Sequence, residues 1–162
     1  MLNPNVGIAY SLGEVEPLIS LLRERVKSTT QMPRASANLD NHPLVAQTTA
    51  FLRNRTSGRL DTRKIAALYG EPLSRFAAAY SVTPAAVTQT PDSTKYQSLL
   101  GYFERAARII PLLESKSMFA TWAKTPNDAL HGGTPVDMLF GGAKKAQALI
   151  DVVEDVLTGQ PD

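Results

Sequence analysis

The chain of 162 residues contains no cysteine, which excludes disulfide bonds, cysteine-ligated zinc and thiol catalysis. It also lacks any apolar run near the ~18 residues of a membrane-spanning helix, and no signal-peptide pattern opens it. Histidine is scarce: His42 and His131 are too far apart in the sequence for metal-ligand spacing, and we expect them at the surface or in caps. No HExxH, GxSxG, P-loop or GxGxxG motif occurs. These absences predict a cytoplasmic protein that is not an enzyme and that binds no metal or cofactor.

The pattern of apolar residues is helical. No alternating run of β-branched residues is long enough for a sheet, so we expect an all-α protein. We divide it into an N-terminal helical extension (residues 1–58), a central helical region (59–116) and a C-terminal unit (117–162). The extension should hold one helix starting at Pro17 and another that starts at Pro43 and stops near Ser57-Gly58.

The central region carries closely spaced helix start and stop signals. Asp61 or Thr62 can cap a helix that Gly70 ends, and Pro72 can open the next. A longer apolar stripe covers residues 94–113, where Pro111 predicts a kink or a break.

Residues 72–90 have the proportions of a helix-turn-helix, whose second helix begins at Thr83-Pro84. The two helices would pack through Leu73, Phe76, Ala77, Val82 and Val87. Arg75 is a candidate phosphate contact, and Gln89 could pair with adenine. The candidate base-reading residues are Thr83, Ala85, Ala86, Thr88 and Gln89.

The second helix is poor in cations, because no Lys or Arg lies between Arg75 and Lys95. Phosphate contacts supply much of the affinity for DNA. Neighbouring helices would therefore have to provide them, and the candidate cations are Arg59, Arg63, Lys64, Arg75, Lys95, Arg105 and Arg108. The alternative is a helix-turn-helix that serves only as a packing module.

An ordered motif occupies the C-terminal unit: Trp122, then Pro126-Asn127, then Leu130-x-Gly132-x-Thr134-Pro135-x-Asp137-x-Leu139. The single Trp of the chain can anchor a core or an interface. Asn127 can cap the next turn, Thr134 with Pro135 can open a helix, and Gly132 with Gly133 can supply positive φ. An amphipathic helix over 143–157 follows, with its apolar residues at Ala146, Leu149, Ile150, Val153, Val156 and Leu157.

This motif resembles the toxin-binding domain of Xre/MbcA/ParS-type antitoxins, and residues 60–115 resemble the Xre-like region that precedes it. The resemblance implies an all-α antitoxin of a type II toxin–antitoxin system, with a RES-type, NAD-consuming toxin as partner. It also implies homodimerisation and autorepression by operator binding. The candidate toxin-binding residues are Trp122, Asn127, Leu130, Asp137, Asp151, Glu154 and Asp155.

Charge is distributed unevenly: residues 117–162 hold three Lys/Arg and six Asp/Glu, and residues 58–116 hold eight and five. An acidic last helix would complement the cationic cleft that an NAD pyrophosphate requires. Alternatively, its carboxylates form only a solvated face and the toxin contacts another surface. A different class of function also stays open: a dimeric helix-turn-helix regulator that has no toxin partner.

Overall fold

The computed structural model describes residues 48–113 and 115–159, and this part of the chain is all-helical. No strand occurs within these ranges; two isolated bridges, Arg53 with Leu60 and Asn127 with Gly133, close loops. The α-helices are α3 (Thr62–Tyr69), α4 (Leu73–Tyr80), α5 (Pro84–Gln89), α6 (Gln97–Ala107), α7 (Lys116–Ala123), α8 (Pro135–Phe140) and α9 (Ala143–Thr158). A short 3-10 helix, η2 (Ala50–Leu52), precedes α3, and three others lie between α-helices: η3 (Thr94–Tyr96), η4 (Ile110–Leu112) and η5 (Asp128–Leu130).

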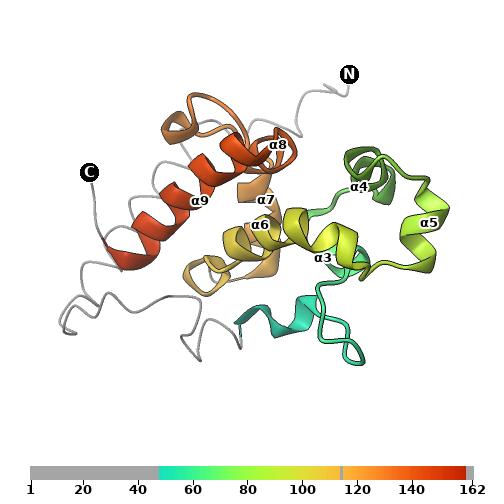
Figure 1. Ribbon diagram of the computed structural model, residues 1–162. Helices are drawn as coiled ribbons and strands as arrows, with labels where there is room; N and C mark the ends of the chain where they lie inside the picture. Colours follow the sequence, from blue (N-terminus) through green and yellow to red (C-terminus); the bar gives the residue numbers. More distant parts are fainter. Residues whose placement is uncertain (1–47, 114, 160–162) are drawn as a thin grey trace, which may run out of the picture.

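Helix α6 lies in the middle of the molecule (Figure 1). On one side of it, α9 packs against both α6 and α8. On the other side, α3 packs against α4, α6 and α7, and α5 packs against α4. As a result, α5 and α9 lie at opposite ends of the molecule (Figure 1).

Local sequence sets most helix ends. The Asp61 carboxylate accepts a hydrogen bond from the N–H of Arg63 at 2.8 Å and so caps α3. Gly70 ends this helix in the left-handed conformation, with φ of 64°. The Thr83 hydroxyl accepts from the N–H of Ala86 and caps α5. These predicted helix ends are confirmed.

Two expected helices end earlier than the sequence indicated. Helix α6 stops at Ala107 and only the 3-10 helix η4 contains Pro111. The predicted break has a steric cause, since a proline ring clashes with the carbonyl four residues before it, which here belongs to Ala107. The prediction of a helix running to Ser57-Gly58 is wrong, because η2 ends at Leu52. The predicted helix starts at Pro17 and Pro43 lie outside the described residues.

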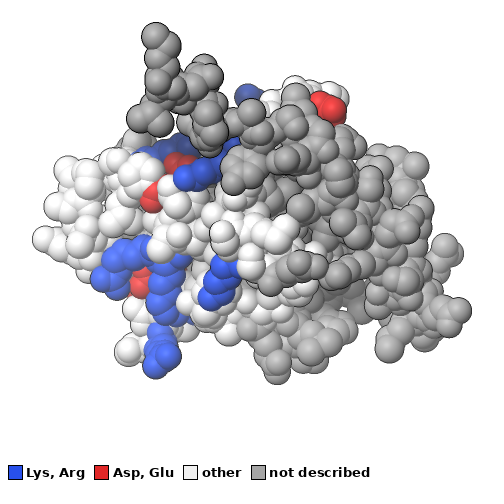
Figure 2. All heavy atoms as spheres, turned by 180° about the vertical axis from the view of Figure 1, so that it is seen from behind, with Lys and Arg blue, Asp and Glu red and all other residues white. Residues whose placement is uncertain are grey.

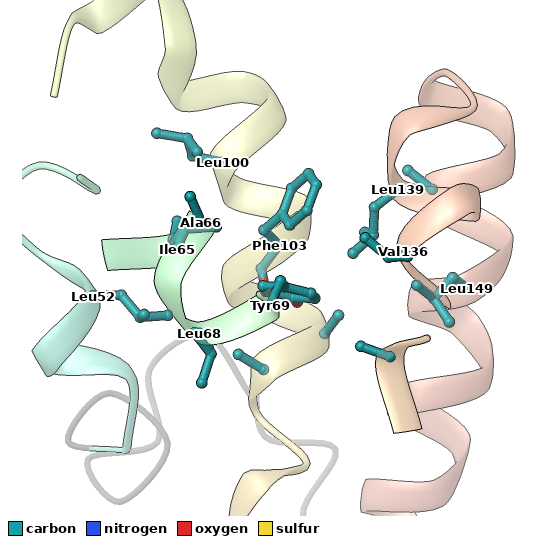
Figure 3. Close-up of a cluster of buried hydrophobic side chains, with 14 of the residues drawn as sticks. Leu52, Ile65, Ala66, Leu68, Tyr69, Leu100, Phe103, Val136, Leu139 and Leu149 are labelled. Atoms are coloured by element: carbon teal, nitrogen blue, oxygen red, sulfur yellow. The ribbon is translucent and has the colours of Figure 1, made fainter. Parts of the chain in front are cut away.

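One aromatic residue of α6 joins the helices around it. The Phe103 ring is fully buried and lies 4.9 Å from Tyr69, 5.1 Å from Phe76 and 5.0 Å from Phe140, measured between ring centroids. Figure 3 shows Phe103 facing Tyr69, with Val136 and Leu139 across the core. Aromatic pairs of this kind contribute about 0.5–1.5 kcal/mol each beyond the burial of their area. The core is therefore continuous from α3 to α9.

We expect Phe103→Ala to lower the free energy of unfolding by about 3–5 kcal/mol, because it leaves a cavity where four aromatic rings meet. Phe51→Ala is the matched control: its ring is 36% exposed and contacts the Lys116 ammonium, so it should cost about 1 kcal/mol or less. Urea unfolding followed by circular dichroism measures both. Equal losses would show that Phe103 is no more important to the core than a surface ring.

Candidate functional site

The predicted helix-turn-helix is present as α4, a short turn and α5. Ser81 adopts the left-handed conformation, with φ of 57°, and reverses the chain. The predicted packing residues lie between the helices or against the core: Phe76, Ala77 and Val87 are buried, and Leu73 and Val82 are half-buried. The packing of α4 against α5 therefore uses the side chains that were predicted from the pattern of apolar residues.

Helix α5 presents the candidate base-reading residues to solvent. Thr83, Ala85, Thr88 and Gln89 are exposed, and Ala86 is half-buried. The Thr88 hydroxyl donates to the carbonyl of Pro84 at 3.0 Å, whereas Gln89 makes no side-chain hydrogen bond within the described residues. Since Val87 is buried, the outward face of α5 carries Ala85, Thr88 and Gln89, whereas Thr83 lies at its N-cap.

Arg75 is directed away from α5, toward α8. Its guanidinium donates to Glu71 at 2.9 Å and to Asp137 at 2.6 Å, and it lies 4.4 Å from the centroid of the Phe140 ring. A predicted DNA contact and a predicted toxin contact, Arg75 and Asp137, are thus joined to each other. The structure gives both side chains a role in fixing α4 to α8.

Of the other candidate cations, Arg105 also faces the C-terminal helices: it pairs with Glu154 of α9 and contacts Gln147. Arg63 and Lys64 lie on α3, Lys95 lies on η3, and Arg59 lies on the loop before α3. Two cations of that loop, Arg53 and Arg55, were not among the predicted residues. Their signal in the sequence is the Arg-x-Arg-x-x-x-Arg spacing of residues 53–59.

Most residues of the C-terminal motif support the fold. Trp122 is only 8% exposed and Leu130 only 4%, so both belong to the core. The ring of Trp122 packs 5.5 Å from that of Phe119, and its helix, α7, packs against α3 and α8. The Asn127 side chain accepts from the N–H of Ala129 and caps η5 as predicted.

The prediction of positive φ for the glycine pair is correct for one residue and wrong for the other. Gly132 has φ of 80°, but Gly133 does not have positive φ. A Cβ atom at Gly133 would instead lie 3.2 Å from the carbonyl oxygen of Leu130, which accepts a hydrogen bond from the Gly133 N–H at 3.0 Å. The reason for glycine at 133 is therefore the close approach of the Leu130 carbonyl within one tight turn. His131, which precedes the pair, is exposed at the C-cap of η5.

The acidic residues of α9 are not equivalent. Ala146, Leu149, Ile150 and Val153 are buried as predicted, which turns the opposite face outward. Glu154 is half-buried beside Arg105, whereas Asp151 and Asp155 are exposed. Asp151 accepts one hydrogen bond, from Gln147 at 2.7 Å. The residues available to a partner are thus Asp151 and Asp155.

The pair of Arg75 and Asp137 should make stability depend on pH. Hydrogen bonds from the Arg75 guanidinium and the Thr134 hydroxyl hold the pKa of Asp137 below its usual value. The folded pKa is depressed, so this stabilisation is present above the unfolded value of about 4 and is lost as the pH falls through the folded pKa.

We therefore expect Asp137→Asn to melt at a lower temperature than the parent at pH 7, by an amount worth about 1 kcal/mol or less, since the side chain is exposed to screening. The difference should shrink as the pH falls below about 4, where the carboxyl begins to protonate in the unfolded chain. Thermal melts across this pH range measure it, with Asp128→Asn, an exposed carboxylate with no ion pair in the described residues, as control. A constant difference at all pH values would contradict the assigned charge pair.

Within the described residues, no group of three His, Asp or Glu side chains could hold a metal ion, and no helix is long and apolar enough to cross a bilayer. Comparisons of the chain with protein-family models, curated proteins and solved structures find no match. Two surfaces are therefore the candidates for function, the outward face of α5 and the carboxylates of α9.

Proposed function

We propose that this protein is the antitoxin of a type II toxin–antitoxin pair and that it also binds its operator through the helix-turn-helix. The observation that carries the proposal is the placement of two exposed surfaces at opposite ends of one core (Figure 1). The face of α5 and the carboxylates of α9 could each meet a partner without hindering the other. One protein with two such surfaces suits a repressor that also neutralises a toxin.

The toxin-binding part of the proposal relies on α9. Asp151 and Asp155 are exposed on a helix whose opposite face is buried, so a partner can contact them without unfolding the core. A RES-type toxin must bind the pyrophosphate of NAD, which requires a cationic cleft. Carboxylates on α9 would complement that cleft and exclude the substrate. Trp122 and Leu130 would support this helix indirectly, as core residues, through the packing of α7 against α8 and of α8 against α9.

The DNA-binding part of the proposal relies on α5. Helices of this class read base edges from the major groove, and a dimer would place two of them on neighbouring half-sites. Gln89 is exposed and has no hydrogen-bond partner in the described residues, so its amide is available for a bidentate contact with adenine. Homodimerisation would compensate for the small size of α5.

We expect Asp151→Lys/Asp155→Lys to keep the fold and to lose neutralisation, because both side chains are exposed and neither forms an ion pair in the described residues. Glu154 is left unchanged, since it pairs with Arg105. Growth of cells that co-express the toxin encoded beside this gene measures protection.

The control is Lys144→Glu/Lys145→Glu, which changes the charge of the same helix by the same amount in the other direction and should still protect. Protection by both variants would move the toxin-binding surface away from α9. If the parent chain itself gives no protection, the alternative function, a helix-turn-helix regulator without a toxin, replaces the proposal.

Gln89→Ala should reduce the preference for operator over random DNA, because it removes a base contact worth about 1–3 kcal/mol, roughly a 5- to 150-fold change in affinity ratio. Binding to random DNA should change little. Fluorescence anisotropy with both duplexes measures the ratio. Gln147→Ala, a glutamine of α9, is the control, and an unchanged ratio for Gln89→Ala would contradict base reading by α5.

A further inference from the structure

We propose that residues 53–64 form a phosphate-binding surface for duplex DNA, which supplies the cations that α5 lacks. Hereafter we call these residues the basic loop, although they include the first turn of α3. The proposal depends on the operator-binding part of the proposed function and adds to it a set of residues outside the helix-turn-helix.

The basic loop concentrates positive charge. It contains one carboxylate, that of Asp61, which is 1% exposed and caps α3. Figure 2 shows Lys and Arg side chains gathered on this part of the surface, at the lower left of the view. The cations of the basic loop are Arg53, Arg55, Arg59, Arg63 and Lys64.

These side chains remain accessible although some of them are paired. The side chains of Arg53, Arg59 and Arg63 are 43%, 45% and 52% exposed. Arg55 is exposed and has no partner in the described part of the chain. Charge pairs hold several of the others in place, as with Arg53, which donates to both oxygens of Glu104 at 2.9 Å.

Hydrogen bonds fix the basic loop to the segment that leaves α5. Thr62 donates from its backbone N–H and from its hydroxyl to the carbonyl of Pro91, at 2.9 and 2.7 Å. The Ser57 hydroxyl donates to Asp92, which also pairs with Arg59 at 3.7 Å. The cations thus have a fixed position relative to the end of α5.

A further polar contact holds the middle of the basic loop. The Gln97 side chain accepts from the N–H of Leu60 at 2.9 Å and donates to its carbonyl at 3.0 Å. Both backbone groups of Leu60 are therefore paired as they would be in a sheet. This arrangement reduces the freedom of the basic loop, so that DNA binding would order few residues.

The chemistry of the surface favours nucleic-acid phosphates. Half to two-thirds of protein–DNA hydrogen bonds go to phosphate or sugar, and arginine matches a phosphate with two parallel N–H donors. Between Arg75 and Lys95 the chain has no cation, and the guanidinium of Arg75 lies against Asp137 and the Phe140 ring of α8. The basic loop is a group of exposed guanidiniums that hydrogen bonds fix to the segment directly after α5.

The test compares two double variants that remove the same charge. Arg55→Gln/Arg63→Gln changes exposed side chains of the basic loop, and Lys144→Gln/Lys145→Gln changes exposed side chains of α9. The full chain is titrated onto two duplexes of equal length, one from upstream of its own gene and one of random sequence, at several salt concentrations.

The basic-loop variant should bind both duplexes more weakly by a similar factor, at least tenfold. The slope of log K against log salt should become shallower by about 0.9 for each phosphate that the variant no longer neutralises, or about 2 for both substitutions together. The α9 variant should keep the parent's slope. Arg55→Gln alone breaks no hydrogen bond or ion pair in the described residues and should reduce the slope by about 1. This single variant replaces the double variant in the test if the double variant unfolds at a lower temperature than the parent.

The possible failures are distinct. If the basic-loop variant keeps the parent's slope while Gln89→Ala alters sequence preference, the basic loop is not a phosphate surface and operator binding still stands. Equal changes in the two double variants would also overturn the proposal, since they would show an effect of net charge alone. Tighter binding to single-stranded RNA than to either duplex would assign the surface to another ligand. If the parent binds neither duplex at low salt, both DNA proposals fail, and toxin neutralisation remains to be judged by the growth assay.

Discussion

The contact between Phe103 and the rings of three other helices holds the two ends of the molecule together. Tyr69 of α3, Phe76 of α4 and Phe140 of α8 all meet this side chain, and the Tyr69 hydroxyl donates to the carbonyl of Phe103 at 2.6 Å. Burial raises the pKa of Tyr69 well above its usual value, so the hydroxyl stays protonated as a donor. Because one residue of α6 contacts both sides, α4 and α8 cannot separate without opening the core.

Ion pairs and a lysine hydrogen bond at the surface also connect helices that are far apart in the sequence. Arg75 links α4 to Asp137 of α8, and Lys124 of α7 donates to the carbonyl of Gly70 at the end of α3. Arg105 does the same between α6 and Glu154 of α9. Exposed pairs contribute little stability individually, but each joins two helices that are distant in the sequence.

Features that depend on neighbours in the chain were predictable from the sequence. The caps at Asp61 and Thr83 and the break before Pro111 follow from local stereochemistry. Helix α7 was missed because its N-cap, Ser115, lies in a short polar stretch that is typical of a connection. The glycine at 133 was assigned the wrong reason, since its constraint comes from the backbone of Leu130 in a closed loop.

For the candidate site as well, local features were predictable from the sequence and contacts between distant residues were not. The outward face of α5 follows from its helical period, but the direction of Arg75 could not be predicted, because its partner Asp137 lies 62 residues away. The pairing of Arg105 with Glu154 is also long-range, which is why α9 offers two accessible carboxylates instead of three. The attachment of the basic loop to Pro91 and Asp92 likewise joins segments far apart in the sequence.

Because the single tryptophan is buried, its intrinsic fluorescence can report on the folded state of the chain. Trp122 is the only residue of its kind in the sequence and lies within the core, beside Phe119 and on a helix packed against α3 and α8. Excitation at wavelengths that only tryptophan absorbs would therefore report on this one buried environment. Emission from this indole would follow the integrity of the interior and would be insensitive to a ligand that merely covers the exposed face of α5 or α9.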